Sequence, residues 1–205
     1  MKEMTLVEFA KQTASNSPVP GGGSIAALAG ALSAALAQMV AELTVNKKGY
    51  EDAEEKMKEL ASKAEVIREK LLDDIKRDSE SFNKYMEALK LPKETDEEKK
   101  LRSNMMQEGL KEAAIVPFEV ASLAYEIMPL ADEAVVSGNK NAVTDGLVSA
   151  MMARTAVLSA LLNTRINLGS IKDQEFVKEY SEKVEKLEKQ AIEFEKNILA
   201  KFYNN

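Results

Sequence analysis

A chain of 205 residues is one large domain or two small ones, and a hydrophobic share of 45% is enough to bury a sizeable core. The formal net charge of −6 gives no sign of the basic face that nucleic-acid binding requires, so no nucleic-acid partner is expected. The absence of Cys and His excludes disulfides, thiolate nucleophiles, Ser-His-Asp triads and imidazole catalysis. A catalytic proton carrier would be Asp, Glu, Lys or Tyr, and no metal site is expected.

The first helical signals lie in the N-terminal quarter of the chain. Thr5 and Glu8 form a capping box that opens a short helix ending near Ser15. After the loop SNSPVPGGGS, we expect Ser24 to cap an Ala-rich helix that continues to about Asn46. A helix that is apolar on all sides is more often the centre of a soluble bundle than a membrane span. We therefore expect a cytoplasmic protein with no membrane partner.

Helical signals continue to the C-terminus, and no run of alternating β-branched residues indicates a sheet. Long helices are expected over residues 51–89, 141–168 and 173–203. Between the first two, a capping box of Thr95 and Glu98 opens another helix. That helix carries Pro117 and Pro129, so it should kink or divide before Gly138. The pattern predicts an all-α, single-domain bundle over residues 1–205. Because its helices differ in length, the bundle should bury its remaining surface as a homodimer.

The helix over residues 51–89 carries a carboxylate on its apolar stripe. Asp78 lies on the stripe at either 3.6 or 3.5 residues per turn, whereas Asp74 lies there only at 3.5. A carboxylate that faces a core loses hydration, which raises its pKa towards the range needed for acid–base catalysis near neutral pH. The alternative is a structural aspartate bonded to Lys or Arg of a facing helix.

The loop before the Ala-rich helix contains three consecutive glycines, Gly21, Gly22 and Gly23, followed by Ser24. Glycines at a helix N-terminus let the backbone approach a ligand and direct N–H groups at an anion. No strand precedes the loop, so its formal match to a dinucleotide-binding fingerprint is rejected. The alternative is a flexible turn with a serine cap.

Three polar side chains cluster where the helix over residues 141–168 begins: Asn139, Asn141 and Asp145. They suit either helix capping or hydrogen bonds to a polar heterocycle. Lys47, in the turn NKKGY, is either solvated or a partner for a ligand carboxylate. Asn163 and Asn167 lie four residues apart in apolar surroundings, where they could bond each other or the backbone.

Seven motifs together resemble a known family. They are PGGGS (20–24), TVNKKGY (44–50), DDIKRDSESF (73–82), LPKETDEEK (91–99), VPF (116–118), GNKNAVTD (138–145) and NTRINL (163–168). In order and spacing, over roughly residues 5–200, they are similar to the cyclodeaminase/cyclohydrolase family. This family comprises the C-terminal domain of formiminotransferase-cyclodeaminase and the stand-alone methenyltetrahydrofolate cyclohydrolases of serine-cycle type.

The resemblance implies an all-helical, dimeric enzyme that acts on a tetrahydrofolate derivative, with no tightly bound cofactor. It places the family's catalytic aspartate at Asp78. It also assigns the glycine loop and the segment containing Asn139, Asn141 and Asp145 to the substrate pocket. In this interpretation the three polar residues orient the pterin, and Gly21–Ser24 with Lys47 receive anionic parts of the folate.

The expected reaction is hydrolysis of 5,10-methenyltetrahydrofolate to 10-formyltetrahydrofolate, with Asp78 as general acid/base. The first alternative is cyclodeamination of 5-formiminotetrahydrofolate, which involves the same carbon and the same proton carrier. The absence of a transferase domain in these 205 residues favours the hydrolase. Two further alternatives are a non-catalytic helical interaction module and a folate-binding protein without turnover.

Overall fold

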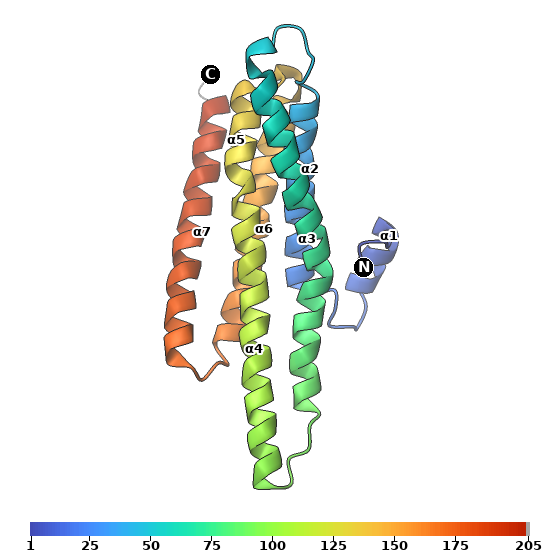
Figure 1. Ribbon diagram of the computed structural model, residues 1–205, viewed down its shortest axis with the longest axis vertical. Helices are drawn as coiled ribbons and strands as arrows, with labels where there is room; N and C mark the ends of the chain where they lie inside the picture. The colour runs from blue at the N-terminus through green and yellow to red at the C-terminus, as the bar shows by residue number, and fades with distance from the viewer. Residues whose placement is uncertain (204–205) are drawn as a thin grey trace.

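The computed structural model describes residues 1–203, which form helices and no strand. The helices are α1 (Leu6–Thr13), α2 (Gly22–Glu42), α3 (Glu54–Leu89), α4 (Asp96–Tyr125), α5 (Ile127–Ser137), α6 (Val143–Leu168) and α7 (Gln174–Tyr203). From α2 onward they run up and down along one long axis (Figure 1). The prediction of an all-α fold is confirmed.

Two Ala-rich helices, α2 and α6, form the centre of the bundle because their small side chains permit close approach. The Ser33 hydroxyl donates to the Ser149 carbonyl at 2.7 Å, and the Ser149 hydroxyl donates to the Ser33 carbonyl at 2.8 Å. A Cβ added to Gly30 would lie 3.5 Å from the Ala156 Cβ of α6 and 2.9 Å from Leu71 Cδ1 of α3, so the two central helices approach closely at this glycine. The helix pair is therefore joined by tight packing and by buried polar groups that satisfy each other.

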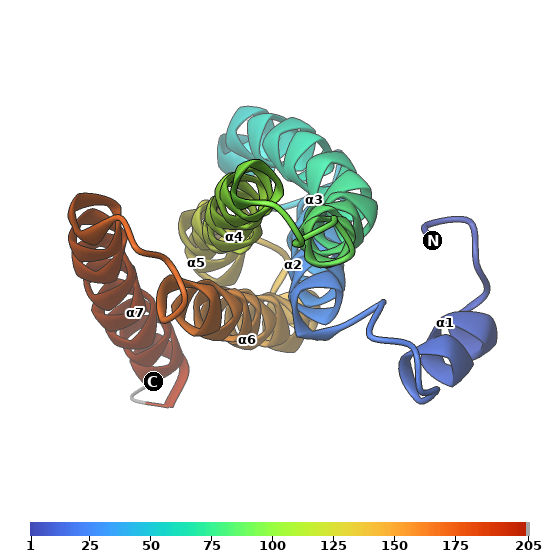
Figure 2. The same cartoon turned by 90° about the horizontal axis from the view of Figure 1, so that it is seen from below.

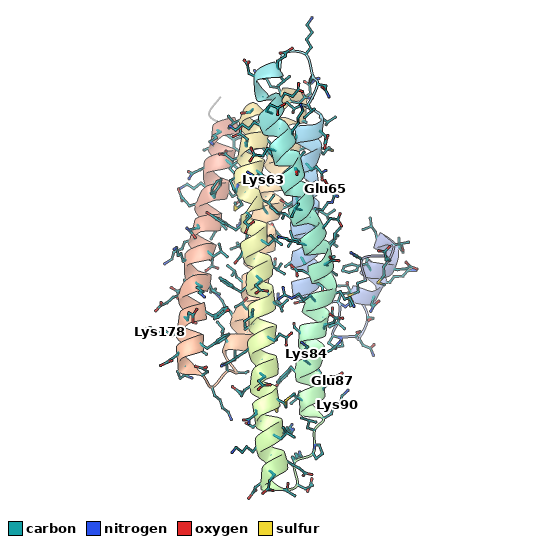
Figure 3. All side chains as sticks on the ribbon, in the orientation of Figure 1. Lys63, Glu65, Lys84, Glu87, Lys90 and Lys178 are labelled. Atoms are coloured by element: carbon teal, nitrogen blue, oxygen red, sulfur yellow. The ribbon has the colours of Figure 1, made fainter. Side chains whose placement is uncertain are left out.

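The remaining helices surround this pair unevenly. Seen from below, α3, α4 and α5 cover one side, α7 lies beside α6, and α1 stands apart beyond α2 (Figure 2). The lower ends of α3 and α4 extend past the connection between α6 and α7 (Figure 1). Exposed charged side chains, including Lys63, Glu65 and Lys84, extend from α3 (Figure 3). One of them, Lys84, pairs with Glu112 of α4 at 2.6 Å.

The predicted start and stop signals agree with the observed helix ends in most places. Both capping boxes form, at Thr5 with Glu8 and at Thr95 with Glu98. The expected division before Gly138 occurs between α4 and α5. The last residue of α4, Tyr125, lies four residues before Pro129, and proline has no N–H to donate to the Tyr125 carbonyl. Pro117, by contrast, lies inside α4 without ending it.

Several predicted boundaries are wrong by a few residues. The N-cap of α2 is Gly21, not Ser24, and the helix ends at Glu42 rather than near Asn46. Short 3₁₀ turns, Glu51–Ala53 and Lys140–Ala142, precede α3 and α6. In the connection after α2, Asn46 and Gly49 both have positive φ, a conformation that ends a helix.

The outer face of α2 and α6 is apolar, and no other described helix covers it (Figure 2). Leu32 of α2 is 47% exposed, and Leu162 and Ile166 of α6 are 64% and 75% exposed. By length and composition alone, three segments are apolar enough to cross a membrane: Gly22–Glu42, Asp96–Ser137 and Lys140–Leu168. Half or more of the most apolar window of each is buried inside the bundle.

Candidate active site

The side chain of Asp78, on α3, lies against the N-terminus of α2. Its Oδ2 accepts a hydrogen bond of 2.9 Å from the Ser24 hydroxyl, which is fully buried and also lies 3.1 Å from the Ile75 carbonyl oxygen. The Ser24 backbone N–H lies close enough to this carboxylate to lower its pKa. Gly21 gives α2 no side-chain cap, so Asp78 supplies acceptors to the first turn of α2 from another helix.

The glycines of the PGGGS motif make this contact possible. A Cβ on Gly23 would lie only 2.0 Å from Asp78 Oδ1 and 2.8 Å from Oδ2. A Cβ on Gly22 would lie 3.1 Å from the Asn163 side-chain nitrogen, close enough to force a small shift. Gly23 is therefore required so that the carboxylate can reach the helix end, a role that the sequence alone did not indicate.

Asp78 and Asp74 differ in their charged partners. Burial raises the pKa of Asp78 above the ordinary aspartate value, the Ser24 hydroxyl and N–H oppose the rise, and the charge of Asp74 adds to it. Burial also raises the pKa of Asp74, which is 8% exposed, but Asp74 pairs with Arg77 at 3.4 Å. Asp78 forms no salt bridge with any residue in 1–203. The alternative considered for Asp78, an ion pair with Lys or Arg of a facing helix, is therefore not formed, and the Asp74–Arg77 pair lies within α3 itself.

A pair of amides on α6 faces Asp78 from the other side. Asn167 Nδ2 donates to the Ala113 carbonyl of α4 at 2.7 Å and to the Asn163 carbonyl at 2.8 Å. The Ala113 carbonyl needs this donor, because its helical partner would be the N–H of residue 117, which is proline. Asn163 Nδ2 in turn donates to the Ser159 carbonyl at 2.8 Å. Both N–H groups of Asn167 are thus committed to the backbone, Asn163 keeps one N–H, and the two side-chain oxygens remain as acceptors.

These groups line one small cavity of about 140 Å³. One wall is the loop 18–23, of which every residue except Pro20 lines the cavity. The other walls are Asp78 and Phe82 of α3, Ala113 of α4, and Asn163 and Asn167 of α6. The cavity offers a carboxylate and two amide oxygens as acceptors, and the backbone N–H groups of Gly22 and Gly23 at the start of α2 as donors. Its acceptors suit a ligand that carries N–H groups or a positive charge.

The other expected site residues lie at the opposite end of the bundle. The 20-residue separation of Gly22 from Glu42 puts about 30 Å of helix between the glycine loop and the turn that contains Lys47. Asn139 is buried there, where its Nδ2 donates to the Leu43 carbonyl at 3.1 Å and its Oδ1 accepts from the backbone N–H of Asn141. Within one chain, Asn139, Asn141, Asp145 and Lys47 are therefore not brought together with Asp78. The capping alternative accounts for Asn139.

The side chains of Asn141, Asp145 and Lys47 form no hydrogen bond or ion pair with other residues in 1–203. The sequence did not identify Phe82 or Ala113 as pocket residues, because neither carries a chemical signal of its own. The sequence marks Asn163 and Asn167 as amides in apolar surroundings and as part of the NTRINL motif, without assigning them to the pocket. Their connection to Pro117 lies 50 residues away in the sequence and becomes visible only when α4 and α6 pack together.

The fold and this cavity define an all-helical bundle with a candidate site around a carboxylate that has no cationic partner among the described residues. Residues 5–186 match the formiminotransferase-cyclodeaminase family, and the chain belongs to that family. The resemblance recognised in the sequence is confirmed.

Individual relatives carry two different activities in their names. Methenyltetrahydrofolate cyclohydrolase of Methylorubrum extorquens is 38% identical over 89% of this chain and 88% of that protein. Formimidoyltransferase-cyclodeaminase of Sus scrofa is 33% identical over 89% of this chain, which spans only 34% of that longer protein. The crystal structure of formiminotetrahydrofolate cyclodeaminase from Thermotoga maritima has a TM-score of 0.86 and 34% identity, covering 96% of this chain and 94% of that one.

Proposed function

We propose that this chain is a folate-dependent enzyme that hydrolyses 5,10-methenyltetrahydrofolate to 10-formyltetrahydrofolate. The observation that carries the proposal is the Asp78 carboxyl, which is partly buried in the wall of a polar cavity and forms no salt bridge with any described residue. The 38% identity across nearly all of a relative named as the cyclohydrolase supports the choice of reaction.

The chemistry proposed for Asp78 follows from the charge of the substrate. The methenyl carbon bridges N5 and N10 in a cationic amidinium, so an adjacent carboxylate stabilises the bound cation. Asp78 accepts a proton as water adds to that carbon. It then returns the proton to N5 as the carbon–N5 bond breaks, while the hydroxyl of the adduct loses its proton to solvent and becomes the formyl group. The raised pKa of Asp78 suits a group that must both accept and donate a proton near neutral pH.

The direct test is the loss of the near-ultraviolet absorbance of 5,10-methenyltetrahydrofolate with and without the protein. Acceleration over the spontaneous rate is expected. A rate equal to the spontaneous one would overturn the cyclohydrolase and leave the cyclodeaminase to be tested next; failure of both activities would favour a folate-binding protein or a helical interaction module.

Cyclodeamination of 5-formiminotetrahydrofolate is the second candidate, favoured by the fold and 34% identity shared with the Thermotoga maritima protein named for it. In that reaction Asp78 would protonate the departing amine. Formation of the methenyl absorbance from 5-formiminotetrahydrofolate tests it in the same cuvette, and the ratio of the two kcat/KM values decides between the activities.

We further propose that the chain works as a cytoplasmic homodimer joined through the uncovered α2–α6 face. The exposed apolar side chains of that face, Leu32, Leu162 and Ile166 among them, would be buried by a second copy. A two-fold axis perpendicular to α2 would set the C-terminal end of one α2 beside the N-terminal end of the other. That arrangement would carry Lys47, Asn141 and Asp145 of one protomer towards the Asp78 cavity of its partner.

Size-exclusion chromatography with light scattering tests the interface. We expect a dimer for the wild type and a monomer for Leu162→Glu, since a charge on each copy would be desolvated at the contact. A variant that remains dimeric would place the interface elsewhere. Folate binding measured on the monomer would then show whether Lys47, Asn141 and Asp145 act across subunits.

A further inference from the structure

A second cavity, of about 540 Å³, lies where the lower ends of α3 and α4 pass the connection between α6 and α7. Among the described residues that line it, four are cationic and none is acidic: Lys93, Lys99, Arg102 and Lys172. In a chain whose net charge is −6, this cavity is a local reversal of sign. Such a concentration of positive charge favours an anion that carries several charges.

Two of the four cations have structural tasks and two do not. The Arg102 guanidinium donates to the Leu89 carbonyl at 3.2 and 3.3 Å, which completes the end of α3 and fixes the group in the cavity wall. Lys99 pairs with Asp96 at 3.1 Å. By contrast, Lys93 and Lys172 are exposed and form no salt bridge with any residue in 1–203, although the Lys172 ammonium donates a long hydrogen bond of 3.5 Å to the Ser103 hydroxyl. Their ammonium groups are therefore available to a carboxylate ligand.

The basic cavity and the Asp78 cavity share one face of α4. Lys99, Ser103, Met106 and Leu110 line the basic cavity, and Ala113 lines the Asp78 cavity. Their spacing of four, three, four and three residues puts all five on the same side of the helix. The basic cavity begins one helical turn from Ala113 and reaches Lys99 about 21 Å away, at 1.5 Å per residue.

At the end of α6 and in the connection to α7 the two cavities are also neighbours. Asn167 lines the first, and Ser170, three residues later, lines the second. Gln107 of α4 holds this connection in place, because its Nε2 donates to the Ser170 carbonyl at 3.2 Å and its Oε1 accepts from the Lys172 N–H at 2.7 Å. A ligand that extends along α4 from Asp78 therefore enters the basic cavity.

We propose that the basic cavity binds the γ-linked glutamate tail of the folate substrate while its one-carbon end lies at Asp78. This inference rests on the proposed function. A tetrahydrofolate derivative has a pterin at one end, a flat aminobenzoyl group in the middle and one or more glutamates at the other end. Each added glutamate contributes one carboxylate. Met106, a half-buried residue in the wall of the basic cavity, gives the aminobenzoyl ring an apolar surface.

The test compares two folates that do not react, pteroylmonoglutamate and pteroyl-γ-triglutamate, by isothermal titration calorimetry. Four proteins are titrated: the wild type, Lys93→Gln/Lys172→Gln, Lys47→Gln and the control Lys186→Gln/Lys189→Gln. The control removes two exposed, unpaired lysines from α7 and so matches the change in net charge. No catalytic turnover is required, so the result does not depend on Asp78 chemistry.

We expect the wild type to bind the triglutamate about tenfold more tightly than the monoglutamate, since each exposed ion pair changes an affinity about two- to fivefold. Lys93→Gln/Lys172→Gln should lose that ratio and the control should keep it. The ratio should also shrink at high salt. Equal binding of the two folates by the wild type, or loss of the ratio in Lys47→Gln but not in Lys93→Gln/Lys172→Gln, would overturn the tail site alone. Absence of binding together with absence of turnover would overturn the proposed function as well.

Discussion

Replacement of Asp78 by Asn separates catalysis from folding. The amide keeps the size of the carboxyl and an oxygen that can accept from Ser24, but it cannot take a proton from water. Loss of a general acid/base costs about 10²- to 10⁴-fold in rate, or about 2.7 to 5.4 kcal/mol of transition-state stabilisation. We expect kcat for methenyl hydrolysis to fall by that factor, measured by the loss of the methenyl absorbance.

The stability of the same variant should change in the opposite direction. Because burial raises the pKa of Asp78, ionisation opposes folding, and the contribution of the neutral form is lost as pH rises through the folded pKa. At pH 7 Asp78→Asn should therefore be at least as stable to urea as the wild type, and the difference should vanish in acid. A fair control is Asp73→Asn, an exposed position on the same helix that pairs only with Lys2, which should keep its turnover. If Asp78→Asn kept turnover within tenfold of the wild type, Asp78 would not be the proton carrier.

Three further changes test the surroundings of the carboxyl. Gly23→Ala should reduce turnover and cost about 1–3 kcal/mol in urea unfolding, because its Cβ would overlap Asp78 Oδ1; unchanged turnover would show that the carboxyl need not touch α2. Asn167→Ala should lower the free energy of unfolding by about 1–3 kcal/mol, because it leaves the Ala113 carbonyl unpaired. In a Pro117→Ala background, which restores the helical N–H, the loss should be smaller; equal losses in the two backgrounds would contradict the pairing. The kcat/KM of hydrolysis should fall as pH decreases through a pKa above the ordinary aspartate value, since only the ionised Asp78 accepts a proton. If the fall in kcat/KM instead occurred at the ordinary aspartate pKa, the raised pKa of Asp78 would play no part in catalysis.

Local signals predicted the helices well where the chemistry is local. The capping boxes at Thr5 and Thr95 each satisfy backbone N–H groups within four residues, so the sequence contains the whole interaction. Ser24 shows the limit of this reasoning. A serine at a helix start reads as a cap, but here the glycine N-cap leaves the Ser24 hydroxyl for Asp78, 54 residues away.

The candidate site was predictable only in part, for the same reason. The position of Asp78 on the apolar stripe indicated burial, and burial raises its pKa as expected. The polar segment at 139–145 looked equally suited to a ligand. Nothing in its sequence states which end of the bundle it occupies, and α2 separates it from Asp78 by about 30 Å within one chain. The Pro117–Asn167 relation needs the register of two packed helices, which no local pattern specifies.

The contact between Asp78 and the first turn of α2 links two events that are usually described separately. A proton on Asp78 removes the charge that the N–H and hydroxyl of Ser24 face, so the end of α2 is held less firmly. Conversely, fraying of that turn removes the hydrogen bonds that lower the pKa of Asp78, so the proton is held more tightly. Proton uptake and local order at the glycine loop are therefore a single coupled equilibrium, and the helix end belongs to the acid–base chemistry as much as the carboxyl does.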